Sequence, residues 1–147
     1  MSNLEELREL ESSGLYVFHG SGEKIEEFEP RQAHNYRNGE KIPDGEPAVF
    51  ASDILDYAIF MALINKSNLP QGYTAGVSNK NGILEFSVSK EVSEKITNEF
   101  KGFVYVFLKN DFERKENSSE YLCKKKIKPI YSICVSRGDF NKTIKIK

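Results

Sequence analysis

Apolar positions recur with a helical spacing in three parts of the chain. Leucines repeat every three residues near the N-terminus, and Gly14 then ends the predicted helix. A second apolar stripe follows Ser52 and Asp53, a hydroxyl residue and an acid that suit a helix cap and first turn. A third short helix is expected after the strand that ends at Val88. The expected helices cover 3–11, 54–64 and part of 90–100.

Most other apolar runs have the two-residue alternation of β-strands. The run 102–109 is apolar on both alternating sets, as a central strand buried on both faces should be. The later runs follow one another without long helices, which indicates antiparallel pairing rather than a doubly wound parallel sheet. The expected strands are 15–18, 48–50, 83–88, 102–109, 120–126 and 129–135.

Two polar stretches, 22–47 and 65–82, are predicted as long loops because glycine and proline interrupt them. Loops of this length inside a compact domain often carry function, so the first is a candidate lid. The whole pattern predicts an α+β fold. We expect one domain over residues 1–147, with a mostly antiparallel, split β-sheet and a few short helices.

The composition is consistent with a folded domain and argues against some classes of binding partner. The chain has 147 residues, of which 39% are hydrophobic and 29% charged, enough to bury one core. A formal net charge of −1 gives no overall field toward nucleic acid or an anionic membrane. The charged N-terminus and the lack of a long apolar run predict a cytoplasmic protein with no membrane contact.

Cysteine and histidine spacing argues against a metal site. His19 and His34 lack ligand spacing and lie far in sequence from the cysteines, so no metal is expected. A hairpin about Lys128-Pro129 would set Cys123 opposite Cys134, which makes a disulfide geometrically conceivable. Without an export signal, two buried free thiols are the favoured interpretation. Walker loops, dinucleotide glycine motifs and nucleophile elbows are absent from the sequence.

Three short motifs carry residues suited to chemistry. The first is His19-Gly20-Ser21 at the end of a predicted strand, where a bare glycine backbone can bond a planar amide. The second is Phe50-Ala51-Ser52, with Tyr57 on the helix that follows, and the third is Ser119-Glu120-Tyr121. A carboxylate at a sheet rim can stabilise positive charge on a sugar ring as a glycosidic bond breaks. The alternatives are a structural histidine and a solvated strand end.

In order and spacing these motifs resemble the ADP-ribosyltransferase fold, in particular its diphtheria-toxin and poly(ADP-ribose) polymerase branch. The three motifs of that branch supply a histidine, a tyrosine and a glutamate. The resemblance extends from about Leu15 to Val135. It implies that the protein uses NAD as a substrate and transfers ADP-ribose to an acceptor that the sequence does not identify.

The resemblance also implies roles for individual residues. His19 would bond the nicotinamide-side ribose, the backbone of Gly20 would hold the nicotinamide carboxamide, and Ser21 would complete that motif. Glu120 would be the catalytic acid residue. The aromatic wall of the nicotinamide pocket would be Tyr57 or Phe60. Phe50, with Ala51, would match the second motif. Ser52 and Arg31 are further candidate NAD-binding residues.

Two positions depart from the family pattern. Val49 falls where many of these enzymes have a tyrosine that stacks on nicotinamide, so either Tyr57 takes over the stacking or the pocket has lost it. Base stacking on an aromatic ring is worth about 1–3 kcal/mol, so its loss would weaken NAD binding tenfold or more. Ser118, two residues before Glu120, is neither Glu nor Gln, which disfavours modification of arginine side chains.

Basic residues outside the motifs have two interpretations each. Arg31, within the first long loop, is suited to bidentate contact with a diphosphate, or to an ion pair with Glu29. Tyr36 is a weaker candidate to cover adenine. The cluster Lys124–Lys126, with Lys128, is either a solvated strand edge or a surface for phosphate or nucleic acid.

Two rival functions follow. An RNA 2′-phosphotransferase-like enzyme would need Arg31, Arg37 and Lys124–Lys126 to converge on an RNA phosphate, and the near-neutral charge counts against it. A non-catalytic nucleotide- or protein-binding module of the same fold would explain Val49.

Overall fold

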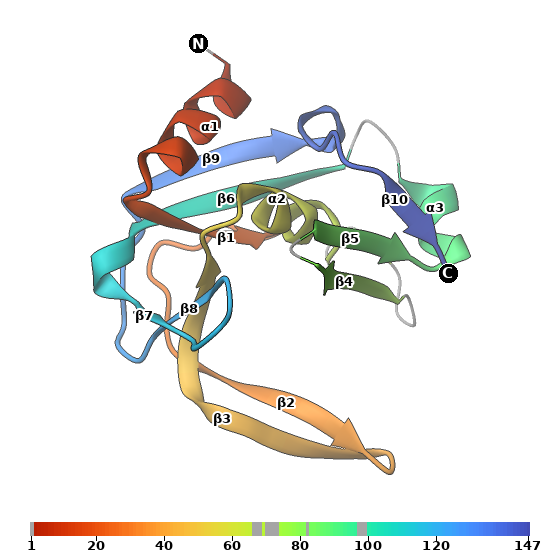
Figure 1. Ribbon diagram of the computed structural model, residues 1–147, viewed down its shortest axis with the longest axis horizontal. Coiled ribbons are helices and arrows are strands. Elements are labelled where there is room, and N and C mark those ends of the chain that lie inside the picture. Colours follow the sequence, from red (N-terminus) through yellow and green to blue (C-terminus); the bar gives the residue numbers. More distant parts are fainter. Residues whose placement is uncertain (1, 66–68, 70–73, 82, 97–99) are drawn as a thin grey trace.

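The computed structural model describes residues 2–65, 69, 74–81, 83–96 and 100–147. Within these residues the chain forms three α-helices and ten strands (Figure 1). The helices are α1 (Asn3–Ser13), α2 (Leu55–Leu63) and α3 (Lys90–Lys95). The strands are β1 (Tyr16–Ser21), β2 (Arg31–Arg37), β3 (Glu40–Ser52), β4 (Ala75–Lys80), β5 (Ile83–Val88), β6 (Lys101–Leu108), β7 (Glu113–Arg114), β8 (Glu120–Cys123), β9 (Tyr131–Ser136) and β10 (Ile144–Ile146). Two 3₁₀ turns are η1 (Lys109–Asp111) and η2 (Arg137–Asp139).

The strands form two sheets. The larger, seven-stranded sheet has the order β7-β8-β3-β1-β6-β9, with β2 paired to β3, and all of its recorded pairings are antiparallel. The smaller sheet has the order β10-β5-β4, in which β10 runs parallel to β5. The prediction of an α+β fold with mostly antiparallel pairing is therefore confirmed.

Strand β6 is the buried strand that its sequence predicted. It pairs with β1 on one side and β9 on the other. Its residues Val104, Tyr105, Val106 and Phe107 are each at most 1% exposed, although their side chains alternate between the two faces of the sheet. The alternation works because one face packs on α2 and the other on a second apolar cluster.

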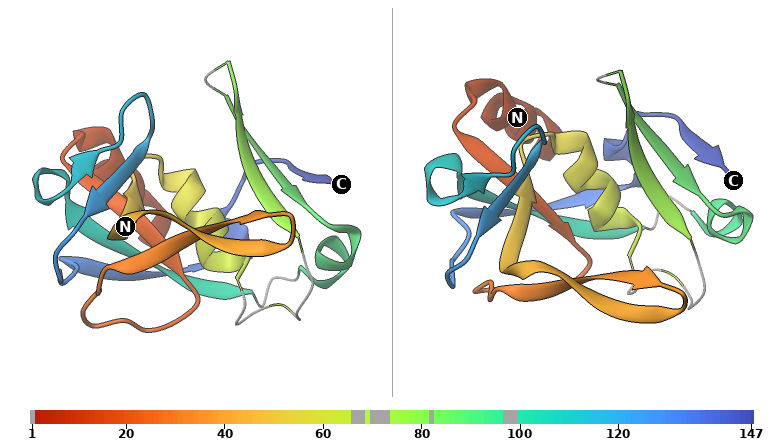
Figure 2. Two further views of the ribbon diagram at one scale, coloured as in Figure 1. Left: turned by 90° about the horizontal axis from the view of Figure 1, so that it is seen from below. Right: turned by 60° about the horizontal axis from the view of Figure 1, so that its bottom comes forward.

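Helix α2 lies between the two sheets (Figure 2). Its buried residues contact β1, β6 and β9 on one side and Phe86 and Val88 of β5 on the other. Two glycines of the large sheet allow this close approach. A Cβ atom on Gly20 would overlap the carbonyl oxygen of Ala58, and one on Gly102 would overlap that of Ala62. The backbone of α2 therefore rests directly on β1 and β6.

The other face of the large sheet is covered by loop residues. Phe28 packs edge-on against Tyr105 and Phe107, with ring centroids 4.9 and 5.2 Å apart. Phe112 contacts Phe107 from the turn that follows β6. The phenol of Tyr105 donates a hydrogen bond to the carbonyl oxygen of Glu23 at 2.6 Å, which holds the segment after β1 against this face.

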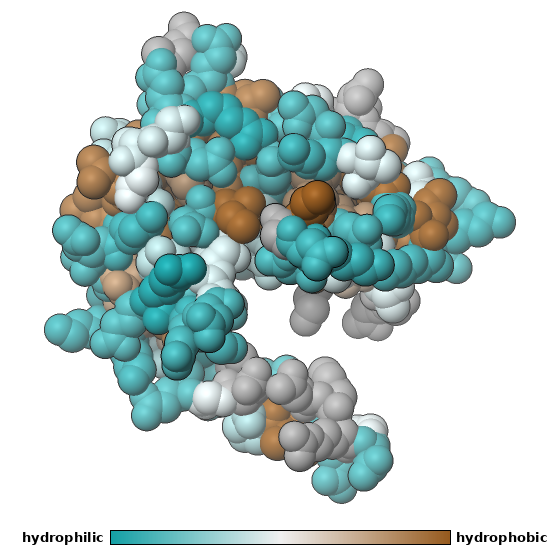
Figure 3. All heavy atoms as spheres, viewed as in Figure 1, coloured by the Kyte–Doolittle hydropathy of each residue, from teal (hydrophilic) through white to brown (hydrophobic). Residues whose placement is uncertain are grey.

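The prediction of a loop over 22–47 is wrong, because most of it is a β-hairpin. Strands β2 and β3 pair from the body outward to a tight turn at Asn38 and Gly39, where φ is 51° and 81°. Asn-Gly is the preferred pair for a two-residue hairpin turn, since both positions need positive φ. The hairpin, here called the β2–β3 arm, projects from the body and is separated from it by an open hollow (Figure 3). The candidate lid is therefore a regular β-hairpin and not an irregular loop.

Two other sequence boundaries also shift. Strand β1 does not stop before His19-Gly20-Ser21, since all three residues pair with β6. Part of the predicted loop 65–82 is strand β4, which pairs with β5 from Ala75 to Lys80, and Asn81 follows with φ of 54°. Residues 66–68, 70–73 and 82 of that predicted loop lie outside the described residues.

The hairpin about Lys128-Pro129 that would have set the two cysteines opposite each other does not form. β8 pairs with β3 and β7, whereas β9 pairs with β6 at the far edge of the same sheet. Cys123 and Cys134 are therefore far apart in the strand order, and both thiols are free, the first buried and the second exposed. The expectation of free thiols is confirmed, but only one of them is buried.

Strand β8 ends at Cys123, so the lysine cluster follows the strand instead of lying along it. The Nζ atom of Lys124 lies 2.9 Å from a carboxylate oxygen of Glu46, and that of Lys126 lies 3.3 Å from one of Glu29. These four side chains are more than half exposed, so each ion pair contributes little to stability. No helix in the described part of the chain is long and apolar enough to cross a membrane.

Candidate functional site

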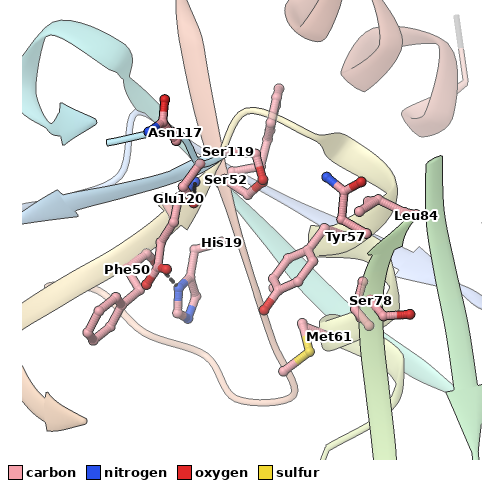
Figure 4. Close-up of a pocket in the computed structure, with 16 residues that line it drawn as sticks. His19, Phe50, Ser52, Tyr57, Met61, Ser78, Leu84, Asn117, Ser119 and Glu120 are labelled. Carbon is pink, nitrogen blue, oxygen red and sulfur yellow. Dashed lines mark hydrogen bonds between the residues drawn. The ribbon is translucent and has the colours of Figure 1, made fainter. Parts of the chain in front are cut away.

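A cavity of about 440 Å³ opens where β1 and β3 diverge (Figure 4). β1 pairs with β6 along its whole length, but among the described residues it pairs with β3 only at Phe18 and Ser52. If that register continued, Gly20 would lie opposite Phe50. Instead both residues line the cavity, together with their neighbours His19 and Ala51. The cavity therefore lies where β1 and β3 would pair if the sheet were continuous.

His19 bridges the gap between the two strands. Its Nδ1 atom lies 2.6 Å from the carbonyl oxygen of Phe50, so Nδ1 carries the proton and donates it to that carbonyl. The imidazole thereby takes the place of the β1 backbone beside the Phe50 carbonyl, while Phe50 pairs with Leu122 of β8 on its other side. Burial lowers the pKa of His19, and the charge of Arg31 lowers it further, against the opposing effect of the bond to Phe50. A neutral ring leaves Nε2 as a hydrogen-bond acceptor.

Glu120 enters the same cavity from β8. It is the first residue of that strand and lies opposite Ser52 of β3. Its backbone N–H donates to the Oγ atom of Ser118 at 2.9 Å, and its side chain is 38% exposed. Its Oε2 atom lies 3.8 Å from the Nζ atom of Lys115. The carboxylate is therefore held at the rim of the cavity with a cation beside it, and Figure 4 shows it on the same side as His19.

Helix α2 supplies the opposite wall through Tyr57 and Met61. These residues are four positions apart and so share one helix face; each is 38% exposed and lines the cavity. Burial raises the pKa of the Tyr57 phenol, and the negative charge of Glu120 raises it further. The phenol and the carboxylate are thus near enough to interact electrostatically across the cavity.

Phe60 does not belong to this site. It is 1% exposed and packs in the core, with ring centroids 5.0 Å from Phe86 and 5.6 Å from Phe140. The prediction offered Tyr57 or Phe60 as the aromatic wall because both lie on the helix. The two residues can be distinguished only when it is known which face of α2 packs on the small sheet. That face carries Phe60.

Several lining residues were missed by sequence reasoning. The β4–β5 hairpin contributes a third wall, and the turn before β8 contributes polar groups at the mouth. Met61 could have been found, because it is one turn from Tyr57. The hairpin residues could not, because β4 lay in a predicted loop. The missed residues are Met61, Val77, Ser78, Asn79, Leu84 and Asn117, whereas Ser119 belongs to the third predicted motif.

Ser21 and Arg31 line a second hollow of about 280 Å³ that shares His19 and Phe50 with the first. The Oγ atom of Ser21 accepts a hydrogen bond from the backbone of Glu23 at 3.1 Å. The recorded ion pair of Glu29 is with Lys126 and not with Arg31. The side chains of Tyr36 and Arg37 lie outside the described part of the structure.

Val49 is 3% exposed and packs in the apolar cluster on the far face of the sheet, so it offers no surface to the 440 Å³ cavity. Ser52 is 4% exposed and lines that cavity, but it does not cap α2 as predicted. Its Oγ atom accepts from the backbone N–H of Ile54 at 3.1 Å, and the helix begins only at Leu55. Within the described residues, no cluster of three or more His, Cys, Asp or Glu is placed to hold a metal.

Comparisons with protein-family models, with curated proteins and with solved structures find no significant match to this chain. The residues of the cavity are therefore the basis on which a function is assigned below.

Proposed function

We propose that the protein is an NAD-dependent enzyme with an ADP-ribosyltransferase-like fold. One observation carries the proposal: His19, Tyr57 and Glu120, from three distant parts of the sequence, line one cavity. This is the set that the resemblance to the histidine-tyrosine-glutamate branch requires, with Tyr57 in place of the tyrosine missing at Val49. The diverging strands β1 and β3 leave room there for a planar amide.

In this proposal NAD binds with its nicotinamide ring between Tyr57 and the backbone of Gly20. The neutral Nε2 atom of His19 accepts a hydrogen bond from a hydroxyl of the adjoining ribose. The bond between the anomeric carbon and the nicotinamide nitrogen breaks, and nicotinamide leaves with the electron pair. Glu120 stabilises the positive charge that develops on the ribose ring. The acceptor then bonds to the anomeric carbon and releases its proton.

The second hollow supports the same arrangement. It adjoins the first at His19 and carries Arg31, a guanidinium suited to bind the diphosphate of NAD, although Glu23, Glu27 and Glu29 line the same hollow and oppose an anion there. An extended dinucleotide would then pass from one hollow to the other beside the imidazole. The charge of Arg31 also helps to keep that imidazole neutral.

The RNA 2′-phosphotransferase-like alternative receives less support, because Lys124 and Lys126 pair with Glu46 and Glu29. A non-catalytic module of the same fold is the second candidate. It is favoured by the valine at position 49, which packs in the apolar cluster and supplies no stacking ring at the position where the resembled enzymes have a tyrosine.

The test combines calorimetry with NAD and release of nicotinamide from labelled NAD in the presence of a cell lysate. The enzyme proposal expects binding to wild-type protein and to Glu120→Gln, with nicotinamide release lost in the variant. Glu116→Gln is the matched control, because Glu116 is exposed in the same turn and does not line the cavity. Binding without release supports the non-catalytic module. Neither binding nor thermal stabilisation at millimolar NAD would refute the assignment of NAD as ligand.

A further inference from the structure

The residue at the N-cap position of helix α2 does not cap the helix with its side chain. Its N-cap residue is Ile54, which makes no side-chain hydrogen bond to the helix. The first backbone N–H groups of a helix have no partner within it, so a buried helix start needs one from elsewhere. Here the N–H of Leu55 donates to the Oε2 atom of Glu11, on helix α1, at 2.7 Å. The cap comes from a residue 44 positions earlier in the chain.

A second contact ties α1 to the same point. An Nη atom of Arg8 lies 2.6 Å from Oδ1 of Asp56, and its other Nη atom lies 3.3 Å from Oε1 of Glu11. The Asp56 side chain is 13% exposed, and those of Arg8 and Glu11 are 32% and 29% exposed. Two carboxylates near a helix N-terminus suit its dipole, and the guanidinium balances their charge. We call Arg8, Glu11 and Asp56 the α1–α2 cluster.

The α1–α2 cluster is adjacent to a wall of the cavity. Asp56 directly precedes Tyr57, and Leu55 is two residues before it. Tyr57 is 38% exposed, so core packing does not enclose its ring. Tyr57 lies in the first turn of α2, and the cluster contacts that turn at the Leu55 amide and the Asp56 carboxylate.

We propose that Arg8 and Glu11 are positioning residues, which fix the start of α2 and thereby set the place of Tyr57 in the cavity. Helix α1 would then serve the site without touching a ligand. The consequence for NAD rests on the function proposed above, but the positioning role does not.

The first test needs no ligand. In Glu11→Ala we expect faster hydrogen exchange at the Leu55 amide, measured by NMR. We also expect the Tyr57 phenol, followed in ¹³C-tyrosine-labelled protein, to titrate at lower pH than in wild type, because a displaced ring loses burial. Glu11→Gln keeps an oxygen that accepts from Leu55 and should restore both readouts. Glu9→Ala, an exposed carboxylate on the same helix, is the matched control.

The second test is a double-mutant cycle on NAD affinity. We expect Glu11→Ala to weaken NAD binding at least about threefold when it is made in the wild-type protein. Made in the Tyr57→Ala variant, it should weaken binding no further. Residues of one contact network show coupling energies of this size. Arg8→Met provides a second variant if Glu11→Ala folds poorly. Unchanged Leu55 exchange and Tyr57 titration in folded Glu11→Ala and Arg8→Met would overturn the positioning role. Wild-type protein that does not bind NAD would instead refute the proposed function, and the ligand-free test would still decide the positioning role.

Discussion

Ser52 of β3 lies opposite Glu120 of β8, and the same serine is the residue at which β3 pairs with Phe18 of β1. One row across three strands therefore places the carboxylate beside the point where β1 and β3 begin to diverge. The position of Glu120 at the cavity is fixed by backbone register and not by a flexible loop. Register is strongly specified here because Phe18 and Ser52 are both buried.

Gly20 should be intolerant of a side chain, because its Cβ would overlap the backbone of Ala58 in α2. We expect Gly20→Ala to lower the free energy of unfolding by at least about 1–3 kcal/mol, as overpacking does, measured by denaturant unfolding. Gly138→Ala is the control, since a Cβ there meets nothing within 4 Å, and its effect should stay within about 0.5 kcal/mol. Equal stability of the two variants would contradict the close approach of α2.

His19 should make the protein less stable in mild acid. Its folded-state pKa lies below the unfolded value near 6.5, chiefly because of burial, so the unfolded chain binds more protons below that pH. Stability should therefore be full above pH 6.5 and fall as the pH drops, by at most about 1.4 kcal/mol per pH unit for one proton. Denaturant midpoints from pH 7.5 to 5.5 measure this. His19→Gln should flatten the profile, whereas His34→Gln, at an exposed position, should not.

Tyr57 should act through its ring if it stacks on nicotinamide. We expect Tyr57→Phe to keep the Kd for NAD close to that of wild type. Tyr57→Leu should weaken binding by about 1–3 kcal/mol, about 5- to 150-fold, because the stacking surface is lost. Calorimetry on the three proteins distinguishes the roles. Equal losses in both variants would show that the hydroxyl, and not the ring, binds the ligand.

The two thiols should differ in reactivity. Cys134 is exposed on the edge strand β9, and Cys123 is buried in β8. A water-soluble thiol reagent should therefore modify Cys134 in native protein and reach Cys123 only after denaturation. Mass spectrometry of native and denatured samples, with Cys134→Ser as the control, measures this. Rapid modification of Cys123 in native Cys134→Ser would show that β8 opens readily.

The sequence predicted best where the apolar pattern is strong. Strand β6 and the end of α1 at Gly14, which has φ of 72°, lie where expected. The β2–β3 arm was missed because its polar residues show little alternation. Its signal was the pair Asn38-Gly39, which predicts a hairpin turn without any hydrophobic pattern.

The sequence predicted the motif residues of the site better than the elements that enclose the cavity. His19, Tyr57 and Glu120 stand at one cavity, but the sequence could not tell Tyr57 from Phe60, since helical spacing alone does not say which stripe meets a ligand. The cap supplied by Glu11 was equally invisible, because it joins residues distant in the chain. Such contacts depend on how helices pack, which local patterns do not specify.

The irregular pairing between Arg31 and Ala33, where Gln32 bonds the carbonyl oxygen of Gly45 at 2.8 Å, divides the β2–β3 arm into an outer and an inner part. Outer residues pair in an unbroken ladder from Ala33 to Arg37. Equal insertions or deletions in the two outer strands would change the reach of the arm while leaving the row through Ser52 untouched. Evolution or an engineer can thus resize this appendage independently of the cavity below it.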